Sequence, residues 1–184
     1  MRKSEPWYIH AALWVVIVIL SYVLIRVAII NPNKYVAQEK YFKKESRLRM
    51  DNLRQAEMLY AEKHHRFTDS IDSLKSFVEN DSSVIDLMNG VDSLSGKSTN
   101  PFKKLSNGTF NFDSLYATPK SFSPYILQVD TSTSIDTVIN RRGKITSIDT
   151  SIVIGTKYFI KDPDGYGTIG SLTSEALKNT ASWE

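Results

Sequence analysis

The hydrophobic pattern begins with one long apolar run, Ile9 to Ile30, in which Arg26 is the only formal charge. About 20 apolar residues are enough for a helix to span the ~30 Å hydrocarbon layer of a membrane. Signal peptides have a shorter apolar segment, of about 7–15 residues, followed by small residues at a cleavage site. The run ends without such a site, so the sequence predicts a retained transmembrane helix over residues 9–30, with residues 1–8 in the cytoplasm.

A second helical pattern follows, from Asn33 to about His64, without proline or glycine. Its apolar positions recur at steps of three and four residues, which is typical of a helix with one narrow buried face. The sequence therefore predicts an amphipathic helix over residues 31–66, and Pro32 leaves open whether this helix kinks away from the membrane segment or continues it. The face consists of Phe42, Ser46, Met50, Leu53, Ala56 and Tyr60.

Shorter elements are predicted beyond residue 66. Thr68 or Asp69 can cap a short helix whose apolar face runs from Ile71 to Val78, and a second short helix is expected over Val84–Met88. Residues 95–124 are rich in Ser, Asn, Gly and Pro, which indicates an irregular connection with a short strand near residues 109–112. Strands are expected over residues 125–129, 135–140, 144–154 and 157–160, because they are β-branched or aromatic and lie between turn residues. Thr173 can cap a short helical pattern over Ser174–Lys178 with Leu177 facing inward, and the segment from Asp162 to Trp183 is too apolar for a solvated tail, so we expect it to fold back on the domain.

The clearest of these elements is a hairpin that turns at Arg142-Gly143, between two copies of Ser-Ile-Asp-Thr. A two-residue turn there pairs residues whose numbers sum to 285. This register places Asp136 opposite Asp149, with Ile135, Ile139, Ile148 and Ile152 on the other face of the ribbon. The fold class is therefore α+β: an N-terminal transmembrane helix continues into a long amphipathic helix that packs on a small antiparallel sheet, with residues 67–184 as the domain outside the membrane.

Charge is distributed unevenly along the chain, with a net +6 in residues 1–66 and −3 in residues 67–184. A nucleic-acid-binding domain needs its basic surface on the folded part, so nucleic acid is not expected as a partner. The basic residues that follow the apolar run favour a cytoplasmic domain by the positive-inside rule, whereas the 32 Ser and Thr residues from Phe67 onward favour an extracytoplasmic one. The absence of cysteine excludes disulfides and thiolate metal sites.

Candidate chemistry is limited to three places. Asp136 and Asp149 can form an acid–base pair or simply lie on a solvated face. His64 and His65 point about 100° apart on a helix, so they cannot chelate one metal together. No nucleotide-binding, zinc-protease or serine-hydrolase motif occurs, and neither a cofactor nor a small-molecule substrate is indicated.

The third place is the segment Asp162–Ile169, which contains the carboxylates of Asp162 and Asp164. It matches half of an EF-hand calcium loop, but Tyr166 and Thr173 occupy positions at which an EF-hand has carboxylate ligands. Asp162 and Asp164 are therefore candidate calcium ligands. The alternative interpretation is a Pro-Asp-Gly turn that closes a hairpin.

The order of these elements resembles type IV pilins and the pseudopilins of type II secretion. Short motifs carry the same resemblance: the helix end at Leu53–Tyr60 followed by Phe67 and the Ile71–Leu74 segment, then Asn100-Pro101-Phe102, and an ending with Asp164-Gly165 and Trp183. In major pseudopilins this ending binds calcium. A prepilin also has a glycine before its cleavage site and a glutamate at the fifth mature position, and Met1–Ile30 supplies neither in that context.

The chain is more closely similar to a group of uncharacterised single-pass envelope proteins of Bacteroidota and related bacteria, through Gly170-Ser171-Leu172, Asn179 and Ala181–Glu184. The resemblance implies an inner-membrane protein with a periplasmic, pilin-like domain. We expect a non-enzymatic structural or scaffolding subunit, with inner-membrane lipid and other envelope-complex proteins as partners. The alternatives are a membrane-tethered metal-dependent hydrolase and a true minor pilin of a secretion or filament system.

Overall fold

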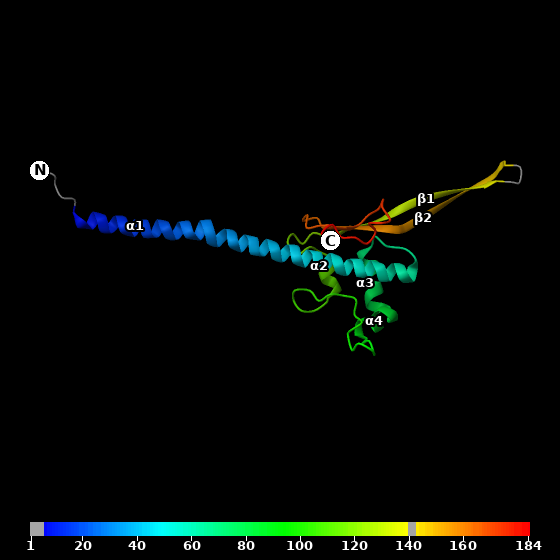
Figure 1. The fold of residues 1–184 in the computed structure, drawn as a ribbon, viewed down its shortest axis with the longest axis horizontal. Helices are drawn as coiled ribbons and strands as arrows, with labels where there is room; N and C mark the ends of the chain where they lie inside the picture. Colours follow the sequence, from blue (N-terminus) through cyan, green and yellow to red (C-terminus); the bar gives the residue numbers. More distant parts are fainter. Residues whose placement is uncertain (1–5, 140–142) are drawn as a thin grey trace. The chain divides into compact units, whose positions relative to one another are not determined.

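The computed structural model describes residues 6–139 and 143–184 (Figure 1). It divides into two compact units, one that ends at Lys43 and one that covers Lys44–Glu184. Helix α1 covers Trp7–Ile25, a π-helical turn covers Arg26–Ile30, and α2 covers Asn31–His64. The long apolar N-terminal helix that the sequence predicts is therefore present.

Within the first unit, this helix is long and apolar enough to cross a membrane, and it is the one such helix among the described residues. Its large apolar side chains are exposed, from Trp7 to Val27. The π-helical turn ends at Ile30, two residues before Pro32, which has no N–H to donate and crowds the carbonyl of Ala28. A wider turn accommodates that crowding, so the helix continues through the proline.

Within the second unit, α2 supplies one wall of the hydrophobic core. Met50, Leu53 and Ala56 are fully buried, as the predicted apolar face requires, and Tyr60 packs at its margin. The buried face is wider than the predicted apolar face, because it also contains three polar residues: Glu45, Asn52 and Glu57.

Two short helices pack beside α2. Helix α3 covers Ile71–Asn80 and buries Leu74, Phe77 and Val78, and its N-cap is Ser70 rather than Thr68 or Asp69. Helix α4 covers Ser82–Asn89, and Asp81 caps it by accepting the N–H of Ser83. The two predicted helices are confirmed with small shifts of their ends.

The sheet has three antiparallel strands in the order β1-β2-β3, covering Ile126–Ile139, Ile145–Lys161 and Thr168–Gly170. The four predicted strands merge into β1 and β2, which lie side by side along their length (Figure 1). The predicted register is confirmed from Thr131 to Val138, since Asp136 pairs with Asp149 and Thr137 with Ile148. Register shifts precede Thr131 and follow Val138, and Arg142 of the predicted turn lies outside the described residues.

Two local predictions are wrong. Residues 109–112 form no strand; instead Phe112–Leu115 is a 3-10 helix, because the side chain of Asn111 accepts the N–H of Asp113 and starts a turn. The helical pattern expected over Ser174–Lys178, with Leu177 facing inward, is a turn in which Leu177 is exposed. One short turn buries too little apolar surface to be held as a helix.

Candidate functional site

The predicted calcium residues lie together in the turn between β2 and β3, where Lys161 pairs with Thr168. Asp162 is buried, and its carboxylate accepts the hydroxyl of Ser46 on α2 and, at 2.6 Å, the N–H of Asp164. The Ser46 hydroxyl also lies 2.9 Å from that of Tyr125. Asp162 therefore connects this turn to the long helix. A Pro-Asp-Gly hairpin turn whose carboxylate has a structural role would make the same contacts.

Asp164 lies nearer the surface and accepts the N–H of Ser121 at 3.2 Å. Partial burial opposes ionisation of this carboxyl, but hydrogen bonds from Thr118 and Ser121 hold its pKa below the ordinary value. Both carboxylates thus already accept protein donors, and no group of three or more His, Asp or Glu side chains converges in the described residues. Calcium binding by Asp162 and Asp164 stays a prediction, in which the ion would compete with Ser46 and Ser121.

The other titratable candidates are also located. Asp136 and Asp149 are cross-strand partners, as predicted, so the acid–base and solvated-face interpretations both remain open. His64 stacks on the ring of Tyr60, with centroids 4.3 Å apart, and His65, the residue after α2, has a positive φ of 56°. The two histidines therefore complete the end of the helix and do not form a paired site.

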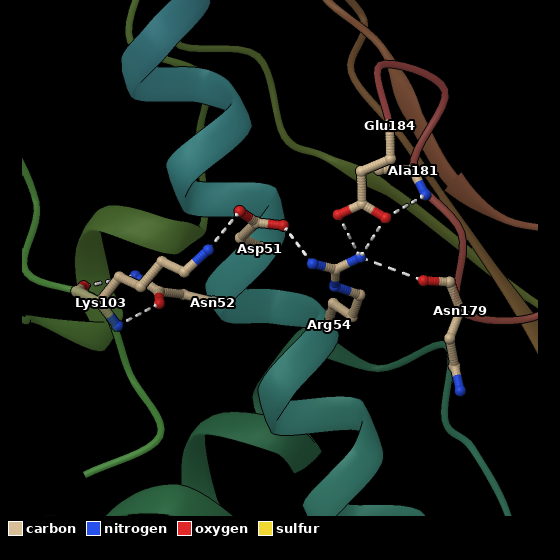
Figure 2. Close-up of polar contacts among 7 residues, drawn as sticks. All are labelled: Asp51, Asn52, Arg54, Lys103, Asn179, Ala181 and Glu184. Atoms are coloured by element: carbon tan, nitrogen blue, oxygen red, sulfur yellow. Dashed lines mark hydrogen bonds and ion pairs between the residues drawn. The ribbon is translucent and has the colours of Figure 1, made fainter.

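The C-terminal segment is fastened to α2 by a polar cluster shown in Figure 2. Arg54 donates to the carboxylate of Glu184 at 3.0 Å and to the carbonyl of Asn179 at 3.1 Å. Asp51 lies between two cations, 2.9 Å from Arg54 and 2.9 Å from Lys103. This cluster confirms that the segment ending at Trp183 folds back on the domain, as its apolar residues predicted.

Trp183 itself is held between two elements. The guanidinium of Arg47 lies 4.9 Å from the centre of its ring, and the ring fills the space beside Gly167. A Cβ atom at Gly167 would lie 2.5 Å from the indole, so this close approach requires glycine.

Polar residues of α2 bind the backbone of the irregular connection between α4 and β1 at three points. Asn52 accepts the N–H of Lys103 at 2.8 Å and donates to its carbonyl at 2.9 Å. Arg49 donates to the carbonyl of Ala117 at 2.7 Å, and Glu45 accepts the N–H of Ser106 at 3.1 Å. Helical periodicity could not reveal these roles, because the bonded connection is distant in sequence and has no regular pattern of its own.

One buried acid stands apart from these paired groups. Glu57 is fully buried, and one carboxyl oxygen accepts the N–H of Thr68 at 3.2 Å, while the other has no partner among the described atoms. The Tyr158 hydroxyl is likewise buried without such a partner. Burial raises the pKa of Glu57 to about 8, so its carboxyl is mostly protonated at neutral pH.

Among the described residues, Asp130 and Gly155 are the last buried ones of the hairpin before its turn, and the side chains described beyond them are exposed. Asp130 is buried at the register shift in β1, and its carboxylate accepts the N–H of Lys157 at 2.6 Å. The carbonyl of Gly155 accepts the N–H of Phe67 at 2.8 Å, just after the end of α2. Gly155 has φ 77°, and a Cβ there would lie 2.6 Å from the carbonyl oxygen of Phe67.

We call the part of the hairpin at Asp130 and Gly155 its root. Beyond the root, residues 131–139 and 143–154 form what we call the distal ribbon. Its described side chains are all exposed, including large aliphatic ones such as Ile148 at 62%, Ile152 at 65% and Ile154 at 54%. Thr131 pairs with Ile154 and Thr137 with Ile148, so one face is built from threonine and isoleucine. Exposed contiguous aliphatic side chains are typical of interaction surfaces, and the distal ribbon is our candidate functional site.

Comparisons of the chain with protein-family models, with curated proteins and with solved structures found no match. Neither the pilin resemblance nor the likeness to the Bacteroidota envelope proteins is tested by them.

Proposed function

We propose that this chain is a membrane-anchored, non-enzymatic structural or scaffolding subunit of a bacterial envelope complex, and that its pilin-like domain lies in the periplasm. The apolar helix serves as the anchor in the inner membrane. The domain presents the distal ribbon to other proteins of the complex. One observation carries the proposal, namely that the ribbon exposes aliphatic side chains, whereas Tyr158 and Ile160 of the same hairpin are buried.

The buried part of the domain supports a structural role. Asp162, Asn52 and Arg54 all bond to segments of the same chain, and each of these contacts ties a loop or the C-terminus to α2. These polar groups thus stabilise a base from which the ribbon extends. A scaffold requires such a base, because a binding surface on a loosely held element loses affinity to the cost of ordering it.

Photo-crosslinking in living cells tests whether the ribbon contacts other proteins. A photoreactive amino acid would replace Ile148 or Ile152, and the control would replace Leu94, which is 99% exposed in a loop away from the hairpin. We expect discrete crosslinked products from both ribbon positions and none from the control. Equal products from all three positions, or none from the ribbon, would contradict the proposal.

The orientation is tested with the same chain, because it contains no cysteine. A Leu94→Cys variant would be treated in spheroplasts with a maleimide that cannot cross the inner membrane. A periplasmic domain predicts labelling without lysis. Labelling only after lysis would place the domain in the cytoplasm.

A further inference from the structure

The outer edge of β1 is open along the distal ribbon. Strand β1 is at the edge of the sheet, with β2 as its one neighbour in the described sheet. From Thr131 to Val138 it pairs without a register shift, so its backbone is regular over that run. Regular, exposed edge strands usually carry lysine, proline or a bulge that prevents further pairing. This run has none of the three, and Asp136 is its one charged residue.

The sequence of this run is complementary to itself. If two copies of β1 lie antiparallel with Ile135 opposite Ile135, then Ser134 lies opposite Asp136, and Thr133 opposite Thr137. No two like charges then meet, and residues of the threonine–isoleucine face lie opposite residues of the same face. A two-fold axis at Asp136 would instead set two carboxylates against each other. Ile135 is therefore the favoured centre.

The chain already makes a similar pairing with itself. The Ser-Ile-Asp-Thr copy in β1 pairs with the second copy in β2, with Ile135 opposite Thr150. That register sets Asp136 opposite Asp149, a contact between like charges that a two-fold axis at Ile135 avoids. A second molecule's β1 offers the same side-chain types to the open edge. The second copy is thus the occupant for which the sequence of this edge is suited.

The outer edge of β2 is less accessible. An analogous axis at Thr150 also avoids like charges, but an antiparallel strand along that edge would run toward Gly155. There the carbonyl of Gly155 is already bonded to Phe67. Beyond it, Phe159 to Lys161 pair with β3. No corresponding contact closes the edge of β1 among the described residues.

We propose that two copies of this chain pair through the β1 edges of their distal ribbons, antiparallel about a two-fold axis at Ile135. The proposal rests on the proposed function, since it names the partner of the same surface. Pairing joins two ribbons into four strands in the order β2-β1-β1-β2, with one continuous threonine–isoleucine face. Two-stranded ribbons are marginal in water, whereas sheets of three or more strands with an apolar face are stable.

Anchoring in one membrane favours this pairing. Two tethered copies meet at a much higher effective concentration than two free ones, so a short strand interface suffices. Closed two-fold pairing also ends with the dimer, because each β1 edge is then occupied.

Disulfide trapping tests the inference in the full-length chain within native membranes, using its cysteine-free sequence as the background. Ile135→Cys places two thiols opposite each other across the two-fold axis, at a separation that a disulfide can bridge. The matched control is Thr150→Cys, its cross-strand partner in the same ribbon. With mild oxidation of the membranes, we expect a band of doubled mass from Ile135→Cys and little from Thr150→Cys.

The register is tested with two further variants. Thr133→Cys and Thr137→Cys should each give little dimer alone but a strong dimer when the two are co-expressed, because residue 133 of one copy faces residue 137 of the other. Dimers in equal amount from Ile135→Cys and Thr150→Cys would show random collision and overturn the proposal. So would no dimer from Ile135→Cys.

The outcome separates this inference from the proposed function. Photo-crosslinks from Ile148 to a different protein, together with no dimer from Ile135→Cys, would overturn the second copy as partner and leave the scaffold intact. Dimers from Ile135→Cys with a cytoplasmic Leu94→Cys would overturn the periplasmic scaffold and leave the pairing intact.

Discussion

The hairpin of β1 and β2 has two halves with opposite surroundings. Between Lys157 and Lys161, Tyr158 and Ile160 are 1% and 0% exposed, and both belong to the core built on α2. In the distal part, Ile148, Ile152 and Ile154 are each more than half exposed. Strand formation therefore does not require burial by the same chain. What separates the halves is the elements that lie against them, and the distal half lacks such a cover in the described chain.

The largest expected difference between the halves is in the cost of truncating an isoleucine. Ile160→Ala should lower the free energy of unfolding by about 2–5 kcal/mol, because it leaves a cavity in the packed half. Ile152→Ala should change it by less than about 0.5 kcal/mol, since that side chain is exposed. Thermal or urea unfolding of the full chain in detergent measures both. Similar losses would mean that the distal half is covered within one molecule.

The packed half should also carry a pH dependence through Glu57, beside Tyr158. Its folded pKa of about 8 lies above the ordinary 4.5. Below pH 4.5 the carboxyl is protonated in both states; as pH rises toward 8 the unfolded chain releases the proton and the folded chain retains it, so stability falls. One pKa unit corresponds to about 1.4 kcal/mol, which gives a loss of about 3 kcal/mol between pH 5 and 7.

Glu57→Gln should remove this component, so the variant gains stability relative to the parent as pH rises from 5 to 8. The matched control is Glu62→Gln, an exposed glutamate on the same helix. Unfolding curves at several pH values give the difference. A parallel pH dependence in the parent and Glu57→Gln would show that Glu57 is ionised in the folded protein.

A smaller effect is expected at the root that separates the halves. Gly155→Ala should cost about 1–3 kcal/mol, because its φ is positive and the new Cβ would meet the Phe67 carbonyl. Gly143 has a similar φ of 75° but open space around it, so Gly143→Ala isolates the conformational part of the cost. Melting temperatures of the two variants measure the steric part as their difference. Equal shifts would show that Phe67 is not fixed against the root.

The sequence predicts the distal half better than the packed half. The period-two pattern and the turn at Gly143 determine the ribbon register, and the pairing of Asp136 with Asp149 agrees with it. In the packed half, the roles of Asn52 and Glu57 depend on loops that reach α2 only in the folded chain. Local periodicity contains no information on such contacts.

In the proposed dimer, a second copy completes the distal ribbon through β1. Hydrogen exchange of the full-length protein in membranes tests it most directly, by comparing residues 131–138 of β1 with residues 147–154 of β2. Pairing through β1 gives that strand a neighbour on both sides, so its amides should exchange more slowly than those of distal β2. Equal exchange in the two segments, or slower exchange in β2, would contradict the account.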